Sequence, residues 1–377
     1  MSRKIDVPAF LQMKASEAKP GEETWWSDFE SLYSKKLWHQ LTLKLLAFLR
    51  RPEAVKENLV QLYDNFIIDF ETKLNPFYLV EMIIFVIQQK SPEETLTFLS
   101  GIKEKVKTNQ EASILTSILL CRVKLSQKDL PGVKAILEEI SPLVDAETGV
   151  TPIHGRYFQL SSDYHQMVGN HNDYYRDCLR YLGCIDIQSQ PLDSLKKMAF
   201  ALSLAALLGD LVYNFGELLQ HPIIEFVRQD SSTAYLFDLL HAFNRGDVAK
   251  YEALKPVWTT QPDLARSEQS LRKKISLLAL MELTFQSQTG VLSFQSIAQM
   301  AHIQHDDVEL LVIKALAKNL VKGTIDEVDQ KVYLTWVQPR VLDKNQISTL
   351  RTKIDNWCRE VRKIEHLLED KAQDIVS

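Results

Sequence analysis

Residues 290–337 contain a change of hydrophobic periodicity that restricts the fold more than any other stretch of this chain. Its first apolar positions recur every three or four residues and predict one face of a helix: Leu292, Phe294, Ile297, Ala298 and Ala301. After a turn at residues 302–305, Asp306 and Asp307 mark the start of a second helix, because acidic side chains stabilise the positive end of a helix dipole. The apolar face of this second helix is predicted to hold Val308, Leu311, Val312, Ala315 and Leu316.

A period of two replaces the helical pattern after these helices. Residues 320–325 and 331–336 alternate apolar and polar side chains on either side of an acidic turn, which predicts a β-hairpin. Helix, turn, helix and hairpin, in this order, predict a winged-helix module over residues 290–337.

The predicted winged helix carries more acidic than basic side chains. It contains four lysines and six acidic residues, for a net charge of −2. Asp306, Asp307 and Glu309 occupy the start of the second helix, which in a helix-turn-helix that binds DNA lies against bases and phosphates. Because affinity for nucleic acid depends on Lys and Arg neutralising phosphates, the pattern favours a wing that binds protein.

Before residue 290 the sequence predicts a succession of helices. The chain has only 12 glycines among 377 residues, and amphipathic segments follow one another from Trp25 onward with short polar breaks. We therefore predict a mainly α chain in which a weakly structured lead-in at residues 1–24 precedes a helical-repeat solenoid at residues 25–289. No strict repeat period is present, so the solenoid is predicted to be degenerate and similar to tetratricopeptide (TPR) packing.

Several joints between these helices have the sequences of helix ends. Asn75–Pro76 and the run from Ser91 to Glu94 are typical of helix N-caps, the second of them a capping box. Gly169–Asn170 and Gly246–Asp247 are typical of a turn in which glycine ends one helix and Asn or Asp caps the next.

A last helix is predicted to begin at Asp343 and to run toward Val376, within a C-terminal segment at residues 338–377. Its apolar positions alternate in spacings of three and four residues, which is the heptad pattern of a helical bundle: Ile347, Leu350, Ile354, Trp357, Val361, Ile364 and Leu368. One alternative is a helix folded back along the solenoid. We favour a seam shared with partner chains, because a strict 3.5-residue period suits bundles better than globular packing.

Neither the composition nor the motifs of the sequence indicate a catalytic or metal-binding site. The net charge is −5, and the four cysteines are scattered without C-x-x-C spacing, which suits a reducing compartment. No window has the roughly 18 apolar residues of a membrane span, and no signal peptide is evident, so we expect a soluble intracellular protein. His302 and His305 are the one close histidine pair, and they lie in the predicted turn without a carboxylate ligand motif. We expect no enzyme activity, no cofactor and no metal.

Five stretches resemble the PCI family, whose modules occur in the proteasome lid, the signalosome and an initiation-factor complex. They are Lys35–Thr42, Asn214–Leu219, Val308–Val312, Val321–Asp329 and Thr335–Leu342. Within that family the chain resembles one lineage of proteasome lid subunits most specifically, and this resemblance spans nearly the whole chain. The resemblance implies a noncatalytic scaffold subunit of the regulatory-particle lid, cytoplasmic and nuclear, that supports ubiquitin-dependent protein degradation. It implies as partners other PCI subunits and the lid isopeptidase dimer, with no nucleic acid and no membrane.

The resemblance also implies where such partners bind. In the PCI family, winged helices associate side by side through a shared sheet, so an edge strand of the wing would bind its neighbour, supplied either by Val321 and Ile325 or by Val332 and Leu334. The terminal helices are gathered into one bundle, which the seam from Ile347 to Leu368 would serve. The alternatives left open are a PCI subunit of the signalosome and an mRNA-export-type PCI protein that binds nucleic acid.

Overall fold

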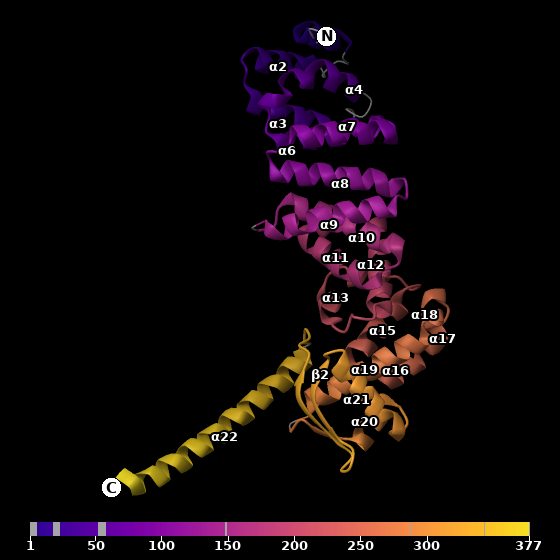
Figure 1. Ribbon diagram of the computed structural model, residues 1–377, viewed down its shortest axis with the longest axis vertical. Coiled ribbons are helices and arrows are strands. Elements are labelled where there is room, and N and C mark those ends of the chain that lie inside the picture. Colours follow the sequence, from indigo (N-terminus) through magenta and orange to yellow (C-terminus); the bar gives the residue numbers. More distant parts are fainter. Residues whose placement is uncertain are drawn as a thin grey trace. The chain divides into compact units, whose positions relative to one another are not determined.

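The computed structural model describes residues 6–17, 23–51, 58–147, 149–287, 289–342 and 344–376. It divides the chain into two compact units, Met1–Val168 and Gly169–Ser377 (Figure 1). Both units are built almost entirely from helices, and the strands of the described residues form one three-stranded sheet in the second unit. The predicted fold class, a mainly α repeat array followed by a winged helix and a long terminal helix, is confirmed.

The first unit is a series of helices in which α7, α8, α9 and α10 each pack against the next. Its helices are α1 (Val7–Glu17), α2 (Glu23–Ser34), α3 (Trp38–Leu49), α4 (Leu59–Leu62), α5 (Ile68–Phe70), α6 (Pro76–Val86), α7 (Pro92–Lys105), α8 (Gln110–Ser126), α9 (Leu130–Ala146) and α10 (Pro152–Val168). Aromatic rings fill the N-terminal part of its core, where Trp26 lies edge-on to Phe29 with ring centroids 5.8 Å apart.

The predicted weakly structured lead-in is wrong for residues 7–17, which form α1. Val7 and Leu11 lie four residues apart, so both side chains point to one face of the helix, where each is 1% exposed. The Gln12 side chain donates a hydrogen bond to Glu30 of α2 at 2.9 Å. The apolar residues of this segment are spread around the helix instead of gathering on one face, so its periodic signal is too weak to reveal the helix.

The helix caps predicted from the sequence are confirmed. The Asn75 side chain accepts a hydrogen bond from the backbone N–H of Phe77 at 2.9 Å, and Ser91 forms a capping box with Glu94. Gly246 ends its helix in the left-handed conformation with φ of +64°, and the Asp247 side chain caps the next helix. A Cβ atom on Gly246 would lie 2.5 Å from the Cα of Ala279, so the turn also needs the space that glycine leaves.

One part of the predicted helical series, residues 54–73, is only partly covered by the structure, because residues 52–57 lie outside the described part. From Leu59 onward it is helical, with a π-helical turn at Tyr63–Ile67 between α4 and α5. The Tyr63 hydroxyl donates to the Glu71 carboxylate at 2.7 Å across this irregular turn. Such a change of helical pitch is not visible in apolar periodicity.

The second unit continues the helical series and ends in the winged helix and the terminal helix. Its helices are α11 (His171–Cys184), α12 (Leu192–Leu208), α13 (Gly216–Gln220), α14 (Ile224–Gln229), α15 (Ala234–Arg245), α16 (Val248–Ala253), α17 (Lys255–Trp258), α18 (Pro262–Arg266), α19 (Glu268–Gln286), α20 (Phe294–Ala301), α21 (Val308–Ala317) and α22 (Lys344–Val376). Its strands are β1 (Val291–Ser293), β2 (Val321–Asp326) and β3 (Lys331–Val337). One core runs through this unit, so that Phe243 of α15, Leu278 of α19 and Ile297 of α20 belong to a single buried cluster.

The winged helix has the predicted order with two corrections at its helix starts. Leu292 lies in β1, where it pairs with Val332, so the first helix begins at Phe294. Asp306 and Asp307 form a short 3₁₀ turn, and α21 begins after them at Val308. The hairpin of β2 and β3 is confirmed, and β1 adds the third strand in the order β1–β3–β2. Three residues are too few to show a period of two, which is why β1 has no sequence signal.

Candidate protein-interaction surfaces

The apolar seam predicted on the terminal helix lies in solvent. All seven seam residues are exposed, from 38% for Leu350 to 66% for Trp357. Every side chain from residue 354 to residue 369 is exposed. Figure 1 shows α22 leaving the base of the wing as a single helix. In the described residues the alternative of a helix folded back against its own chain is not observed.

Leu367 widens this seam, and the heptad pattern did not single it out. It is 56% exposed and lies between Ile364 and Leu368 on the same part of the helix. We call the eight exposed side chains the α22 stripe: Ile347, Leu350, Ile354, Trp357, Val361, Ile364, Leu367 and Leu368. A row of large apolar side chains facing water on one helix marks a surface that binds another protein.

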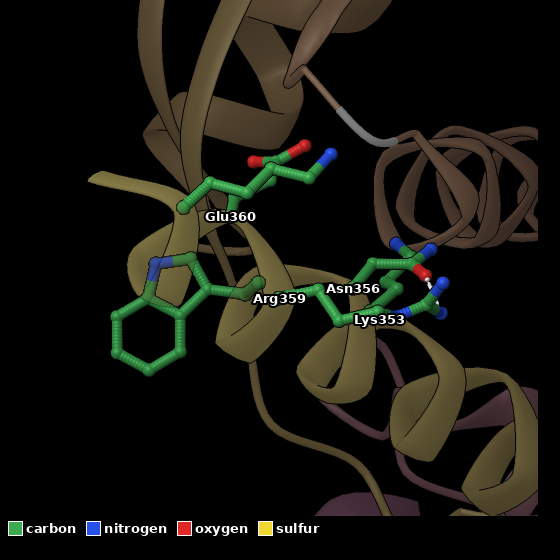
Figure 2. Close-up of a pocket in the computed structure, with 6 residues that line it drawn as sticks. Lys353, Asn356, Arg359 and Glu360 are labelled. Carbon is green, nitrogen blue, oxygen red and sulfur yellow. Dashed lines mark hydrogen bonds between the residues drawn. The ribbon is translucent and has the colours of Figure 1, made fainter. Parts of the chain in front are cut away.

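Polar side chains beside the stripe form a shallow hollow of about 340 Å³. Its described lining residues all come from α22: Lys353, Asn356, Trp357, Arg359, Glu360 and Lys363. Figure 2 shows Arg359 donating to the side-chain oxygen of Asn356 within this group. Because one helix supplies these residues, the hollow does not enclose a small molecule in the way that a ligand pocket does.

The start of α22 is attached to α19. The Gln346 amide donates to the Glu282 carboxylate at 3.0 Å, and Lys353 donates to the carbonyl oxygens of Phe285 and Ser287. Partial burial lowers the pKa of the Lys353 ammonium group below its ordinary value. The first turns of the helix are therefore fixed to the body of the second unit.

The second candidate surface is the edge of the wing, and the strand order decides which residues can form it. The alternative that placed Val332 and Leu334 on the edge is wrong, because β3 is the middle strand. Val332 pairs with Leu292 on one side and with Ile325 on the other. The Leu334 N–H donates to the carbonyl oxygen of Gly290 at 2.7 Å, so its backbone is also engaged on the β1 side.

Val321 and Ile325 lie on β2, which is an edge strand of the sheet. The Val321 side chain is 1% exposed and Ile325 is partly buried, so both face the core of the module. Any pairing along this edge would therefore use the backbone N–H and C=O groups, with exposed Lys322 and Thr324 between the two.

The cysteines of the chain lie in different environments. Burial raises the pKa of the Cys121 thiol to about 12, which keeps it protonated. Cys178 is buried as well, whereas Cys184 is partly exposed and Cys358 is exposed. His302 ends α20 with φ of +49°, which explains its place in the turn. Within the described ranges no group of three or more His, Cys, Asp or Glu side chains is arranged to hold a metal ion.

The helices of the described part of the chain can also be compared with a membrane-spanning helix. None of its helices combines the length and the apolar character that a bilayer crossing requires.

Family comparisons cover most of the sequence. The family model for PSD13 N-terminal repeats matches residues 25–240, and the PCI domain model matches residues 248–336. The 26S proteasome non-ATPase regulatory subunit 13 homolog B of Arabidopsis thaliana is 35% identical over 98% of this chain and 100% of its own length. The 26S proteasome non-ATPase regulatory subunit 13 of Dictyostelium discoideum is 34% identical over 93% of this chain and 94% of its own. The 26S proteasome regulatory subunit RPN9 of Saccharomyces cerevisiae is 31% identical over 98% of both chains.

The chain therefore belongs to the PCI-domain family and, within it, to the family of 26S proteasome non-ATPase regulatory subunit 13.

Proposed function

We propose that this chain is a noncatalytic scaffold subunit in the lid of the 26S proteasome regulatory particle, where it supports ubiquitin-dependent protein degradation. Its relatives are named as non-ATPase regulatory subunits of the 26S proteasome, and the match to them covers nearly their full length. The observation that carries the proposal is the α22 stripe, which exposes eight large apolar side chains on one helix face. A surface of this kind binds protein partners and does not serve a small substrate.

The stripe has the geometry of one strand of a helical bundle. Its heptad spacing places apolar side chains where each can insert between side chains of a neighbouring helix. Burying a Leu, Ile or Val side chain stabilises by roughly 1.5–3 kcal/mol, so the seven such residues of the stripe would together contribute roughly 10–21 kcal/mol, which is of the same order as the roughly 4–15 kcal/mol that association costs in lost freedom. We propose that other lid subunits supply the remaining helices of this bundle.

The edge of the wing supplies a second contact. β2 presents its outer backbone groups from Val321 to Ile325, and strand addition by a neighbouring PCI subunit would satisfy them. The acidic residues before α21 disfavour phosphate there, which supports a protein neighbour over nucleic acid. We propose that the partners are the other PCI subunits and the lid isopeptidase dimer, in the cytoplasm and the nucleus.

The experiment replaces two seam residues with charged ones. We expect Leu350→Asp combined with Val361→Asp to reduce incorporation into the lid at least tenfold, because each aspartate would be buried without a partner in the bundle. The tagged variant is expressed in cells that lack the native subunit, and co-purifying proteins are quantified by mass spectrometry and native gels.

The matched control places aspartates on the opposite side of the same helix. Thr352 and His366 are exposed and lie outside the α22 stripe, so Thr352→Asp with His366→Asp is expected to leave incorporation unchanged. Normal incorporation of the Leu350 and Val361 variant would rule out the proposed role of the seam.

A further inference from the structure

The segment between β3 and α22 is fixed to the body of the second unit. The Val341 N–H donates to the side-chain oxygen of Asn214 at 3.1 Å, and the Gln220 amide donates to the carbonyl oxygen of Leu342 at 3.3 Å. A Cβ atom on Gly216 would lie 2.6 Å from the Cβ of Val341, so the segment is pressed against backbone there. This connection is therefore a packed part of the unit.

Arg340, in the same segment, is a buried cation. Its side chain is 5% exposed and forms an ion pair with Glu282 of α19, whose side chain is 8% exposed. It also donates to the carbonyl oxygen of Asn244 at 3.0 Å. That carbonyl lies in the last turn of α15, where helix carbonyls have no partner within the helix. Arg340 thus joins the ends of α15 and β3 to α19.

Glu282 extends the same network into α22. Its Oε2 atom accepts from Arg340 and, at 3.0 Å, from the Gln346 amide of α22, while its Oε1 accepts from Gln286 at 3.1 Å. Gln346 is 8% exposed, in contrast to the solvated side chains further along its helix. One buried carboxylate therefore holds the connecting segment and the first turn of α22 in place together.

Two attachments determine the direction of α22. Gln346 is held by Glu282, and Lys353 is held by the carbonyl oxygens of Phe285, in the last turn of α19, and of Ser287, just after it. These residues lie about two helical turns, or roughly 10 Å, apart along the helix. A helix attached at one point could rotate about that point, whereas two attachments to the same rigid helix fix the direction of its axis.

We propose that Arg340 is a positioning residue which, through Glu282 and Gln346, sets the direction in which the α22 stripe is presented to partner helices. This inference rests on the proposed function, because it assigns the stripe to a bundle. A helix held in its bound direction loses less freedom on assembly than one that samples many directions. If the competent direction is populated only about one-tenth of the time, the apparent affinity falls about tenfold.

The first experiment measures the direction of α22 in the purified full chain. Nitroxide labels are placed on the exposed native Cys358 of α22 and on a cysteine replacing Leu310 of α21, which is 50% exposed. Cys184 is replaced by serine, and Cys121 and Cys178 are buried from the label. Pulsed electron paramagnetic resonance then gives the distribution of distances between the two labels.

Two variants release the helix in different ways. Gln346→Leu removes the hydrogen bond from α22 to Glu282 and leaves the ion pair of Arg340 with Glu282 in place, whereas the pair Glu282→Met with Arg340→Met removes both charges, so that neither remains buried alone. We expect a single narrow distribution in the parent chain and an at least twofold broader one in both variants, with unchanged circular dichroism. The control is Arg351→Met, which removes an 84% exposed side chain that pairs with Asp355 of the same helix, and it should stay narrow. A broad parent distribution, or variants as narrow as the parent, would overturn the proposal.

The second experiment measures assembly with the α22 stripe untouched. At limiting expression we expect Gln346→Leu and the double methionine variant to reduce lid incorporation about tenfold, and Arg351→Met to leave it unchanged. Broadened distances with normal incorporation would show that direction does not matter for assembly, which overturns the proposal. Normal incorporation of Leu350→Asp with Val361→Asp would instead reject the proposed function, and the distance widths would still decide whether Arg340 holds the helix.

Discussion

The two longest helices of the second unit, α19 and α22, use apolar side chains in opposite ways. In α19 every residue from Lys274 to Glu282 is buried, so the helix is surrounded by its own chain. In α22 every side chain from residue 354 to residue 369 is exposed. The first helix lies in the core of the unit, whereas the second exposes its apolar side chains to water. The difference shows that apolar content alone does not decide whether a helix belongs to a core.

The polar side chains of α19 and α22 differ as clearly as their apolar side chains do. The buried polar groups of α19 are satisfied within the chain: Lys274 donates to three carbonyl oxygens, Ser276 to Arg272, and Thr284 to Leu280. On α22 the charged groups pair with residues one turn away, as Arg351 does with Asp355, and such exposed pairs contribute little to stability. A core helix needs partners for its polar atoms, whereas a surface helix leaves them to water.

The largest expected contrast is the stability effect of truncating a leucine in each helix. Leu278 of α19 is 0% exposed, so Leu278→Ala should lower the free energy of unfolding by about 2–5 kcal/mol through lost burial and a residual cavity. Leu350→Ala in α22 should change it by no more than about 0.5 kcal/mol in the isolated chain. Urea unfolding of the two variants compares them directly, and equal losses would show that α22 is part of the core of the free chain.

A smaller effect is expected where another turn meets α19. Gly246→Ala forces a side chain into the left-handed region, 2.5 Å from the Cα of Ala279, and should cost about 1–3 kcal/mol or more. Gly169 has φ of +80° and open space around its Cβ position, so Gly169→Ala should cost only about 1–2 kcal/mol. Thermal unfolding of the pair separates the effect of packing against α19 from that of backbone conformation.

A third expected effect is a pH dependence that comes from Lys274 of α19. Burial lowers the pKa of its ammonium group from 10.5 to about 7, although the group donates to the carbonyl oxygens of Ala206, Leu207 and Gly209. Between about pH 7 and 10.5 the unfolded chain therefore binds more protons than the folded chain, so stability should rise with pH in this window.

Replacing this lysine tests the sign of that dependence. The slope cannot exceed about 1.4 kcal/mol per pH unit for one group, and Lys274→Met should remove it. Urea unfolding at several pH values, with Lys273→Met as the neighbouring control, measures the difference. A parent chain whose stability falls over this window relative to Lys274→Met would mean that the three carbonyl oxygens hold the charged form and outweigh burial.

Much of the fold could be predicted because its determinants are local. The caps at Asn75 and Ser91 depend on residues within three positions, and the hairpin depends on alternation over two short runs. The seam of α22 depends only on spacing along one helix. Each of these signals is complete within one stretch of sequence.

The features that were missed depend on residues that are far apart in the sequence. β3 is the middle strand because β1, three residues long and about forty residues upstream, pairs with it, and so Val332 and Leu334 do not lie on the edge. Arg340 and Gln346 meet Glu282 from 58 and 64 positions away, and none of the three stands out in its own segment. Such polar contacts are recognisable only once the chain is folded.

The exposed α22 stripe also has a consequence for the amount of this protein that a cell can tolerate. A copy made without partners keeps the apolar side chains of the stripe exposed to water. These side chains can then bind other copies or any nearby hydrophobic surface. If partner helices cover the stripe as proposed, production must stay matched to that of those partners, and surplus copies are expected to be the ones that aggregate or are removed first.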